Sequence, residues 1–117
     1  MGGDNRDRSE LIEPRRRRRL LYCLCLYATP LKLGDIADQL ARWESDRSLD
    51  RSRDAHLQRR VRIYDSLVRE HLPALCDAGV VEYHRRDDMI EWGSAGAEIE
   101  PALRRQYSRE ATSLLAS

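Results

Sequence analysis

Residues 72–83 constrain the fold of this chain more than any other stretch, because the side-chain pattern changes from helical to extended at one glycine. Before that glycine, Leu72 and Leu75 recur at the spacing of one helix face. Gly79 stands where a helix commonly ends in a residue at positive φ, a conformation that glycine adopts without steric cost. Two β-branched valines follow at once and favour an extended strand. The stretch therefore predicts a helix that leads directly into a strand.

A short hairpin is predicted after the glycine. Residues 85–88 (Arg-Arg-Asp-Asp) form its charged tip, and residues 89–92 (Met-Ile-Glu-Trp) form its second strand. Residues 31–33 alternate apolar and polar side chains, which predicts a very short strand that pairs with the hairpin. A helix, a glycine, a strand, a charged tip and a strand make up the second half of a winged helix-turn-helix. The chain is therefore expected to be mainly α with a small β-hairpin wing and a C-terminal helix.

Three helices are predicted before the hairpin. The first covers residues 14–27, since proline is tolerated in a first helical turn, and the second opens near Asp35, which can cap it. The third covers residues 54–78, with a kink expected at Pro73 because proline cannot donate a backbone hydrogen bond. Its predicted apolar stripe consists of Leu57, Val61, Tyr64, Val68, Leu72 and Leu75.

The chain of 117 residues is long enough for one domain with a modest core. Residues 1–12 are polar and are predicted to be a flexible tail, and residues 13–95 form the winged helix-turn-helix domain. Residues 96–117 form an amphipathic helix, which must bury its stripe against its own domain or against a second subunit. This helix is therefore a candidate dimerisation element, with the stripe Leu103, Tyr107, Ala111, Leu114 and Leu115.

Basic side chains occur where a winged helix meets double-stranded DNA, at the start of the third helix and on the hairpin tip. If that helix enters the major groove, arginines on the hairpin reach a neighbouring phosphate or the minor groove. The net charge is only +1, so a local basic face must provide the attraction. Alternatively, each arginine pairs with a nearby acidic residue. The predicted DNA-binding residues are Arg53, His56, Arg59, Arg60, Arg62, Arg85 and Arg86.

Residues 15–19 are five consecutive arginines near the start of the first predicted helix. Cations are unfavourable at this end of the helix dipole, and five in a row extend right around the helix. Two interpretations stay open at this level. The run is either a solvated, mutually repelling surface, or a clamp that gains partners from the phosphates of DNA.

Residue types that carry catalysis are not grouped in this sequence, and no enzyme activity is predicted. The three histidines fall on different predicted elements, and no nucleophile sits in a glycine-rich turn. The cysteines are odd in number and lack the spacing of a zinc module, so reduced thiols, no metal and no cofactor are expected. The apolar stretch of residues 20–28 is too short to span a bilayer, and a cytoplasmic location with no membrane partner is expected.

A resemblance to a known family rests on five segments: residues 16–22, 33–37, 61–67, 71–75 and 78–83. Its most specific part is His-Leu-Pro-Ala-Leu at residues 71–75 with the Ala-Gly-Val-Val that follows. These segments resemble a group of haloarchaeal winged-helix domains that are ArsR-like in shape and mostly of unknown function, and the resemblance covers residues 13–92. It implies a winged-helix fold and a role in transcription control. The metal-binding cysteine pair of ArsR sensors has no match in the third helix.

The sequence thus predicts a cytoplasmic, homodimeric, DNA-binding transcription regulator without a cofactor or small-molecule substrate. The alternative is a winged helix that serves as a protein–protein interaction module and does not bind DNA. In that case the arginines would be neutralised by acidic neighbours, and a large apolar patch would be exposed.

Overall fold

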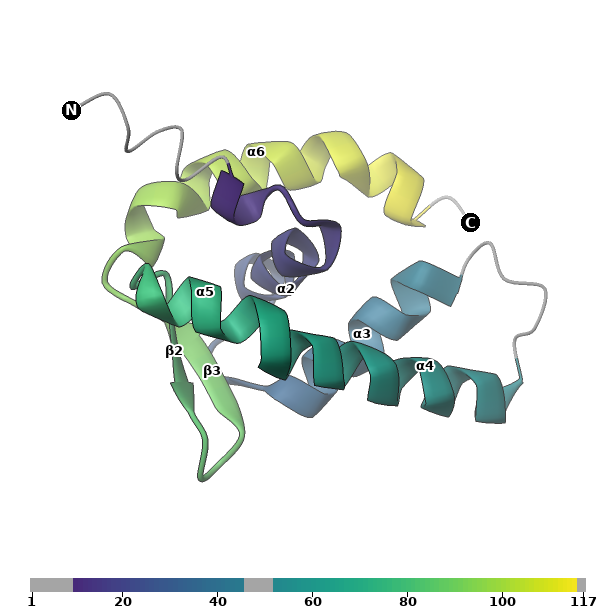
Figure 1. Cartoon of the computed structure of the whole chain (residues 1–117). Coiled ribbons are helices and arrows are strands. Elements are labelled where there is room, and N and C mark those ends of the chain that lie inside the picture. The colour runs from purple at the N-terminus through teal and green to yellow at the C-terminus, as the bar shows by residue number, and fades with distance from the viewer. Residues whose placement is uncertain (1–9, 46–51, 116–117) are drawn as a thin grey trace.

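The computed structural model describes residues 10–45 and 52–115, without the side chains of residues 45 and 113–115 (Figure 1). Along these residues, a single helical turn at residues 10–12 is followed by six longer helical segments and three strands. In chain order they are α2 (Arg15–Leu26), β1 (Leu31–Lys32), α3 (Leu33–Ser45), α4 (Arg53–Ser66), the π-helix η1 (Leu67–His71), α5 (Leu72–Asp77), β2 (Val81–His84), β3 (Met89–Trp92) and α6 (Gly96–Leu115).

The three strands form one antiparallel sheet with β3 in the middle and the order β1-β3-β2. Leu31 and Tyr83 both lie opposite Ile90, whose side chain is fully buried, so this face of the sheet covers the core. The strand between the first two helices and the hairpin after the third match the predicted arrangement. The fold class is confirmed: a mainly helical domain with a small β wing and a C-terminal helix.

The third predicted helix is continuous over α4, η1 and α5, but one turn of it is wider than an α-helix (Figure 1). In this π-turn the Leu72 N–H donates to the carbonyl of Leu67, five residues back. Pro73 follows directly, and its ring would clash with the carbonyl of Arg69 in a regular α-helix. The wider turn accommodates this clash without breaking the helix, so the expected kink takes the form of a π-turn.

The π-turn also changes which side chains of this helix are buried. It aligns Leu72 with Leu67, whereas an unbroken α-helix would align Leu72 with Val68. Ile63 and Leu67 are therefore fully buried, while Val61 is 65% exposed and Val68 is 36% exposed. The predicted stripe is thus wrong in its first half, because one extra residue in the turn shifts the phase of the apolar pattern.

The helix ends as predicted at Gly79, which has φ of 72°. Its N–H donates to the carbonyl of Cys76 at 3.0 Å, and the Val80 N–H donates to the carbonyl of Leu75 at 3.0 Å. This pair of bonds is a Schellman motif, which needs a left-handed residue after the helix. The expected helix-to-strand transition is confirmed.

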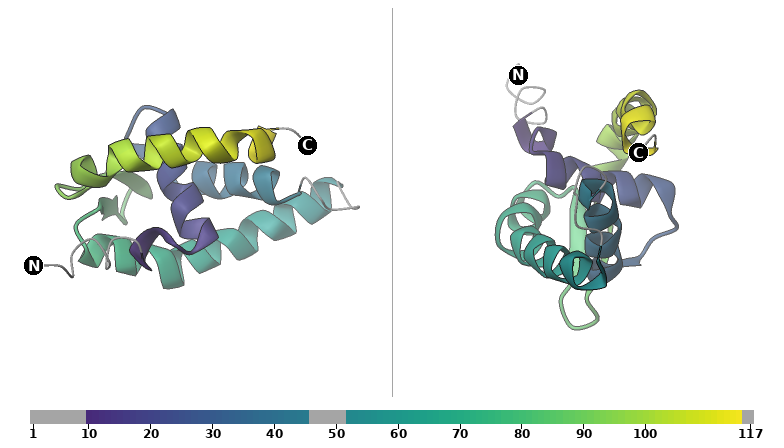
Figure 2. Two further views of the ribbon diagram at one scale, coloured as in Figure 1. Left: turned by 90° about the horizontal axis from the view of Figure 1, so that it is seen from above. Right: turned by 90° about the vertical axis from the view of Figure 1, so that its right-hand side faces the viewer.

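The helix α2 lies between α6 on one side and the long helix with α3 on the other (Figures 1 and 2). Leu103 of α6 is fully buried, and the ring of Tyr107 packs edge-to-face on Tyr22 of α2 with 5.2 Å between the ring centroids. The Tyr22 hydroxyl donates to Oε1 of Glu110 at 2.7 Å. Leu103 and Tyr107 of the α6 stripe are therefore used within the chain's own core.

The predicted flexible tail partly belongs to the folded domain. Residues 10–12 are helical, and Leu11 and Ile12 pack half-buried against the core. Residues 1–9 of the predicted tail lie outside the described residues, as do residues 46–51 between α3 and α4.

Candidate nucleic-acid interface

The carboxylate of Asp88 connects the hairpin tip to α4 by a hydrogen bond. The hydroxyls of Tyr64 on α4 and Tyr83 on β2 both donate to Asp88 Oδ1, each at 2.8 Å. Burial and these hydrogen bonds raise the pKa of both tyrosines. The Leu33 N–H also donates to the backbone carbonyl of Asp88 at 2.9 Å. The wing is thus held in a fixed position beside α4, on the side of the molecule away from α6 (Figure 1).

Two of the predicted DNA-binding residues on α4 are exposed, Arg53 and Arg62. Neither side chain has a hydrogen bond or an ion pair to a described residue. Arg59 is half-buried and likewise has no such partner within the described ranges. The helix that carries them begins after Ser52, whose side chain accepts from the Ala55 N–H at 3.1 Å and caps the helix. A capped helix start with free guanidinium groups is suited to phosphate contact.

Two other predicted residues, His56 and Arg60, face α3 instead. His56 Nε2 lies 2.7 Å from Asp38 Oδ1, and this hydrogen bond lowers the pKa of Asp38. Arg60 Nε donates to the backbone carbonyl of Gly34 at 3.3 Å. Both side chains therefore join α4 to α3, unlike those of Arg53 and Arg62.

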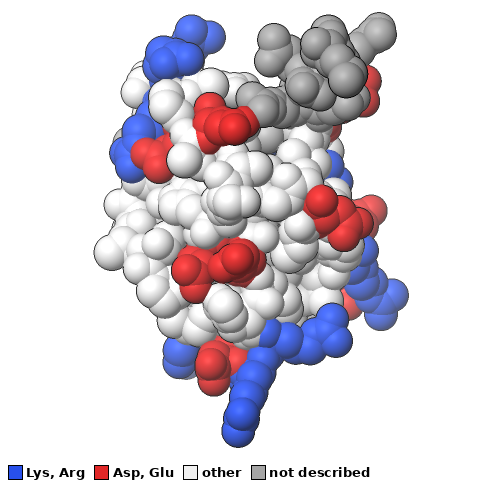
Figure 3. Space-filling view, turned by 90° about the vertical axis from the view of Figure 1, so that its left-hand side faces the viewer, with Lys and Arg blue, Asp and Glu red and all other residues white. Residues whose placement is uncertain are grey.

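The remaining two predicted residues, Arg85 and Arg86, are exposed on the hairpin tip, and their side chains have no hydrogen bond or ion pair to any described residue. Seen from the hairpin side, Lys and Arg atoms project from the lower edge of the molecule, where the tip lies in Figure 1 (Figure 3). Acidic side chains are scattered over the rest of this face. On this face, Lys and Arg atoms lie at the lower edge and also at the upper left and right edges, with acidic side chains between them (Figure 3).

The exposed side of α4 also carries apolar side chains. Leu57 is 45% exposed and Val61 is 65% exposed, and together with Arg62 they line a shallow hollow. Val68 continues the row two turns after Val61. The outward face of α4 is therefore mixed, with aliphatic groups between arginines.

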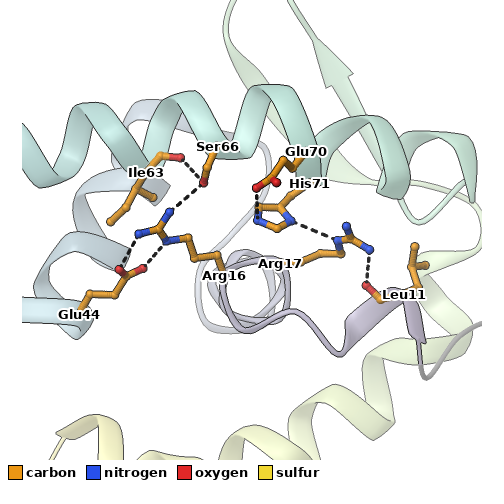
Figure 4. A network of polar contacts seen from close by, with 8 residues as sticks. All are labelled: Leu11, Arg16, Arg17, Glu44, Ile63, Ser66, Glu70 and His71. Atoms are coloured by element: carbon orange, nitrogen blue, oxygen red, sulfur yellow. Dashed lines mark hydrogen bonds and ion pairs between the residues drawn. The ribbon is translucent and has the colours of Figure 1, made fainter.

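The run of arginines on α2 is largely directed into the molecule. Arg16 makes two hydrogen bonds to Glu44, at 2.8 and 3.0 Å, and a third to Ser66 Oγ at 3.2 Å (Figure 4). Arg17 donates to Nδ1 of His71 at 3.3 Å and to the backbone carbonyl of Leu11 at 3.0 Å. These arginines link α2 to α3, to the π-turn and to the segment before α2.

The next two arginines of the run are also half-buried. Arg18 Nε donates to Glu110 Oε1 on α6 at 2.8 Å, and the Arg18 side chain is 16% exposed. Arg19 Nε is buried and has no hydrogen-bond partner among the described residues, and burial lowers the pKa of its guanidinium. Arg16, Arg17 and Arg18 therefore link elements of the fold, whereas Arg15 is exposed and stays compatible with either interpretation of the run.

His71 is the buried polar side chain of the described core, 7% exposed. Because its Nδ1 accepts from Arg17, the neutral ring carries its proton on Nε2, which faces Glu70 Oε2 at 3.8 Å (Figure 4). Burial and the nearby Arg17 lower the pKa of His71. The protein thus holds this histidine neutral at the π-turn.

The cysteines do not form a site. Cys23 and Cys25 are buried in α2, and burial raises their pKa to about 12 and about 11. Cys76 on α5 is exposed, and partial burial of its thiol also raises the pKa. Thiols in this state are poor nucleophiles at neutral pH.

The order of elements defines the protein as a mainly helical domain with a small β wing, which lies beside α4. The chain belongs to the family described as Domain of unknown function (DUF7344), whose model matches residues 9–91. Neither the curated proteins nor the solved structures contain a match to this chain. Within the described residues, every helix is too short or too polar to cross a membrane.

Proposed function

We propose that this protein is a DNA-binding transcription regulator whose α4 enters the major groove while the hairpin wing contacts the phosphate backbone. The observation that carries the proposal is the set of exposed arginines on the two adjacent elements. Arg53 and Arg62 on α4, and Arg85 and Arg86 on the tip, have no acidic partner among the described residues. Double-stranded DNA is then the partner, and the cytoplasm is the compartment.

The anchoring of the wing supports this proposal energetically. A binding surface made of two elements loses affinity if the elements must first be ordered relative to each other. The two tyrosine hydrogen bonds to Asp88 hold the tip against α4 before any ligand is present. The resemblance to haloarchaeal ArsR-like winged-helix domains supports the same function. Aliphatic Val61 would face thymine methyl groups in such a complex.

Binding to duplex DNA of random sequence across a salt series tests the proposal. The double variants Arg53→Ala/Arg62→Ala and Arg85→Ala/Arg86→Ala should each weaken binding by about tenfold or more at low salt. Each should also reduce the slope of log affinity against log salt, by about one for each phosphate that the variant no longer neutralises. Fluorescence anisotropy of labelled duplexes measures both quantities.

The matched control is Arg105→Ala/Arg109→Ala, which removes the same charge from exposed positions on α6, on the opposite side of the molecule (Figure 1). Its affinity should stay close to that of the wild type. Equally weakened binding in all three double variants would mean a nonspecific charge effect, and it would contradict the proposed face. Absence of binding by the folded wild type at low and at high salt would rule out the DNA function.

A second function, protein–protein interaction through α4, is favoured by the exposed aliphatic row of Leu57, Val61 and Val68. The variant Val61→Lys separates the two functions, because an added positive charge strengthens phosphate attraction and disrupts an apolar contact. Tighter DNA binding by this variant would favour the groove. If the wild type binds no DNA, this row becomes the surface to examine for a protein partner.

Homodimerisation stays a prediction and is part of the proposal. Leu103 and Tyr107 are committed to the chain's own core, so a dimer contact through α6 would have to rely on Ala111, Leu114 and Leu115. Sedimentation equilibrium of the wild type and of Leu114→Ser/Leu115→Ser tests this. A monomer in both cases would contradict the predicted dimerisation element.

A further inference from the structure

Three side chains with metal-ligating atoms meet on the outer face of the hairpin. Glu82 and His84 lie two residues apart on β2, so their side chains leave the same face of the strand. Glu91 on β3 is directly opposite Glu82 in the register of the sheet. One ligand atom from each of the three residues lies within 4.8 Å of the other two. His84 Nε2 and Glu91 Oε2 are already 2.7 Å apart.

The charges at this position are unusual for a pair of strands. Carboxylates that face each other directly across a sheet repel, and the pairing is destabilised. Among the described residues, the side chain of His84 is the partner of the Glu91 carboxylate, and the Glu82 carboxylate has no hydrogen bond or ion pair. A cation between the two carboxylates would turn this repulsion into attraction.

We propose that Glu82, His84 and Glu91 form a binding site for one divalent transition-metal ion of the Zn²⁺ class. Imidazole nitrogen with carboxylate oxygen is a donor set that such ions accept, at about 2.0–2.2 Å from each donor. Donors around one ion are then about 4 Å apart or less, and small rotations of these accessible side chains provide that spacing. Three protein ligands leave further coordination positions open to water or to an outside ligand.

The site has a rigid support even though its side chains are accessible. The four residue pairs between β2 and β3 fix the backbone on which all three ligands stand. The tip beyond them is held by the two hydrogen bonds to Asp88. This site does not depend on DNA binding, because its ligands lie on the face of the strands and the arginines lie on the tip.

Calorimetric titration of the tag-free full chain with ZnCl₂ tests the proposal. We expect binding of one ion per chain in the wild type and in Cys76→Ser, which removes the exposed thiol as a competing ligand. In the Cys76→Ser background, His84→Ala and Glu91→Gln should each weaken Zn²⁺ binding by about tenfold or more. MgCl₂ should give no binding, because Mg²⁺ requires oxygen ligands.

Glu70→Gln is the matched control, since Glu70 is also an exposed carboxylate beside a histidine but has no third donor among the described residues. It should leave Zn²⁺ affinity unchanged. Glu82→Gln provides a second readout: without metal it should be at least as stable as the wild type to heat, because one of two facing charges is removed. With ZnCl₂ it should show a smaller rise in melting temperature than the wild type.

Absence of Zn²⁺ binding to the folded wild type would overturn the proposal. Binding that disappears in Cys76→Ser would also overturn it, because the thiol would then be the ligand. An equal loss of affinity in Glu70→Gln and Glu91→Gln would point to nonspecific attraction by surface carboxylates, with the same consequence.

Discussion

At the scale of single residues, this protein places charged groups inside a small domain and satisfies most of them. Arg16, Arg17 and Arg18 each have at least two described hydrogen-bond partners, while Arg19 Nε has none among the described residues. An unpaired buried donor costs stability, and a paired one contributes little on balance. The paired arginines of α2 therefore connect this helix to α3, to the π-turn and to α6.

The buried His71 should make stability depend on pH. Its pKa is lowered in the folded state, so the unfolded chain binds a proton more readily, and stability falls as the pH drops below about 6.5. Urea unfolding at about pH 7.5 and about pH 5.5 should therefore give a larger decrease in stability for the wild type than for His71→Gln, which cannot titrate but can still accept from Arg17. Parallel pH curves for the two proteins would contradict a neutral, buried histidine.

At the scale of elements, the π-turn and the Asp88 anchor determine how the long helix is presented. The π-turn shifts the apolar phase, so that the start of α4 exposes Leu57 and Val61 while the π-turn itself buries Leu67. Asp88 then joins the wing to the middle of the helix through Tyr64. As a result, α4 exposes both aliphatic and arginine side chains, and the wing is held in a fixed position beside it.

Replacement of Asp88 should loosen this connection. Asp88 has φ of 57°, so Asp88→Gly keeps the backbone conformation available and removes only the acceptor for the two tyrosines. We expect unfolding free energy to fall by about 1–3 kcal/mol, as measured by urea denaturation. Asp88→Asn retains an acceptor oxygen and tolerates positive φ, and its stability should fall less. Unchanged stability of Asp88→Gly would contradict the role of Asp88 as the acceptor of both hydroxyls.

At the scale of the whole molecule, α6 completes the core by packing on α2. Tyr107 contacts Tyr22, and Glu110 accepts from both Arg18 and Tyr22. The family model ends at residue 91, so this helix lies beyond the matched segment and is nevertheless part of the folded unit.

Removal of the Glu110 carboxylate should destabilise the entire domain. Glu110→Ala leaves the guanidinium of Arg18 and the hydroxyl of Tyr22 without this partner, and we expect unfolding free energy to fall by about 1–3 kcal/mol. The control Glu100→Ala removes an exposed i,i+4 ion pair with Arg104 on the same helix, and its melting temperature should stay near that of the wild type. A comparable decrease in the control would mean that the effect comes from the helix and not from its docking on α2.

The sequence alone determined the order of elements, the helix stop at Gly79 and the hairpin, because these depend on neighbouring residues and on local backbone conformation. Of the candidate site, it also indicated the exposed arginines of the hairpin tip. Local chemistry of this kind is visible in the order of the residues.

Only the tertiary structure decided where the other charged groups point. Linear spacing could not show that His56 and Arg60 face α3, since their partners lie on a different helix. It could not reveal the Glu82, His84 and Glu91 cluster either, because Glu91 reaches it only through strand pairing. The predicted apolar phase of α4 is wrong for a different reason: the periodic pattern assumes an unbroken α-helix, and the π-turn before Pro73 changes the register of the helix.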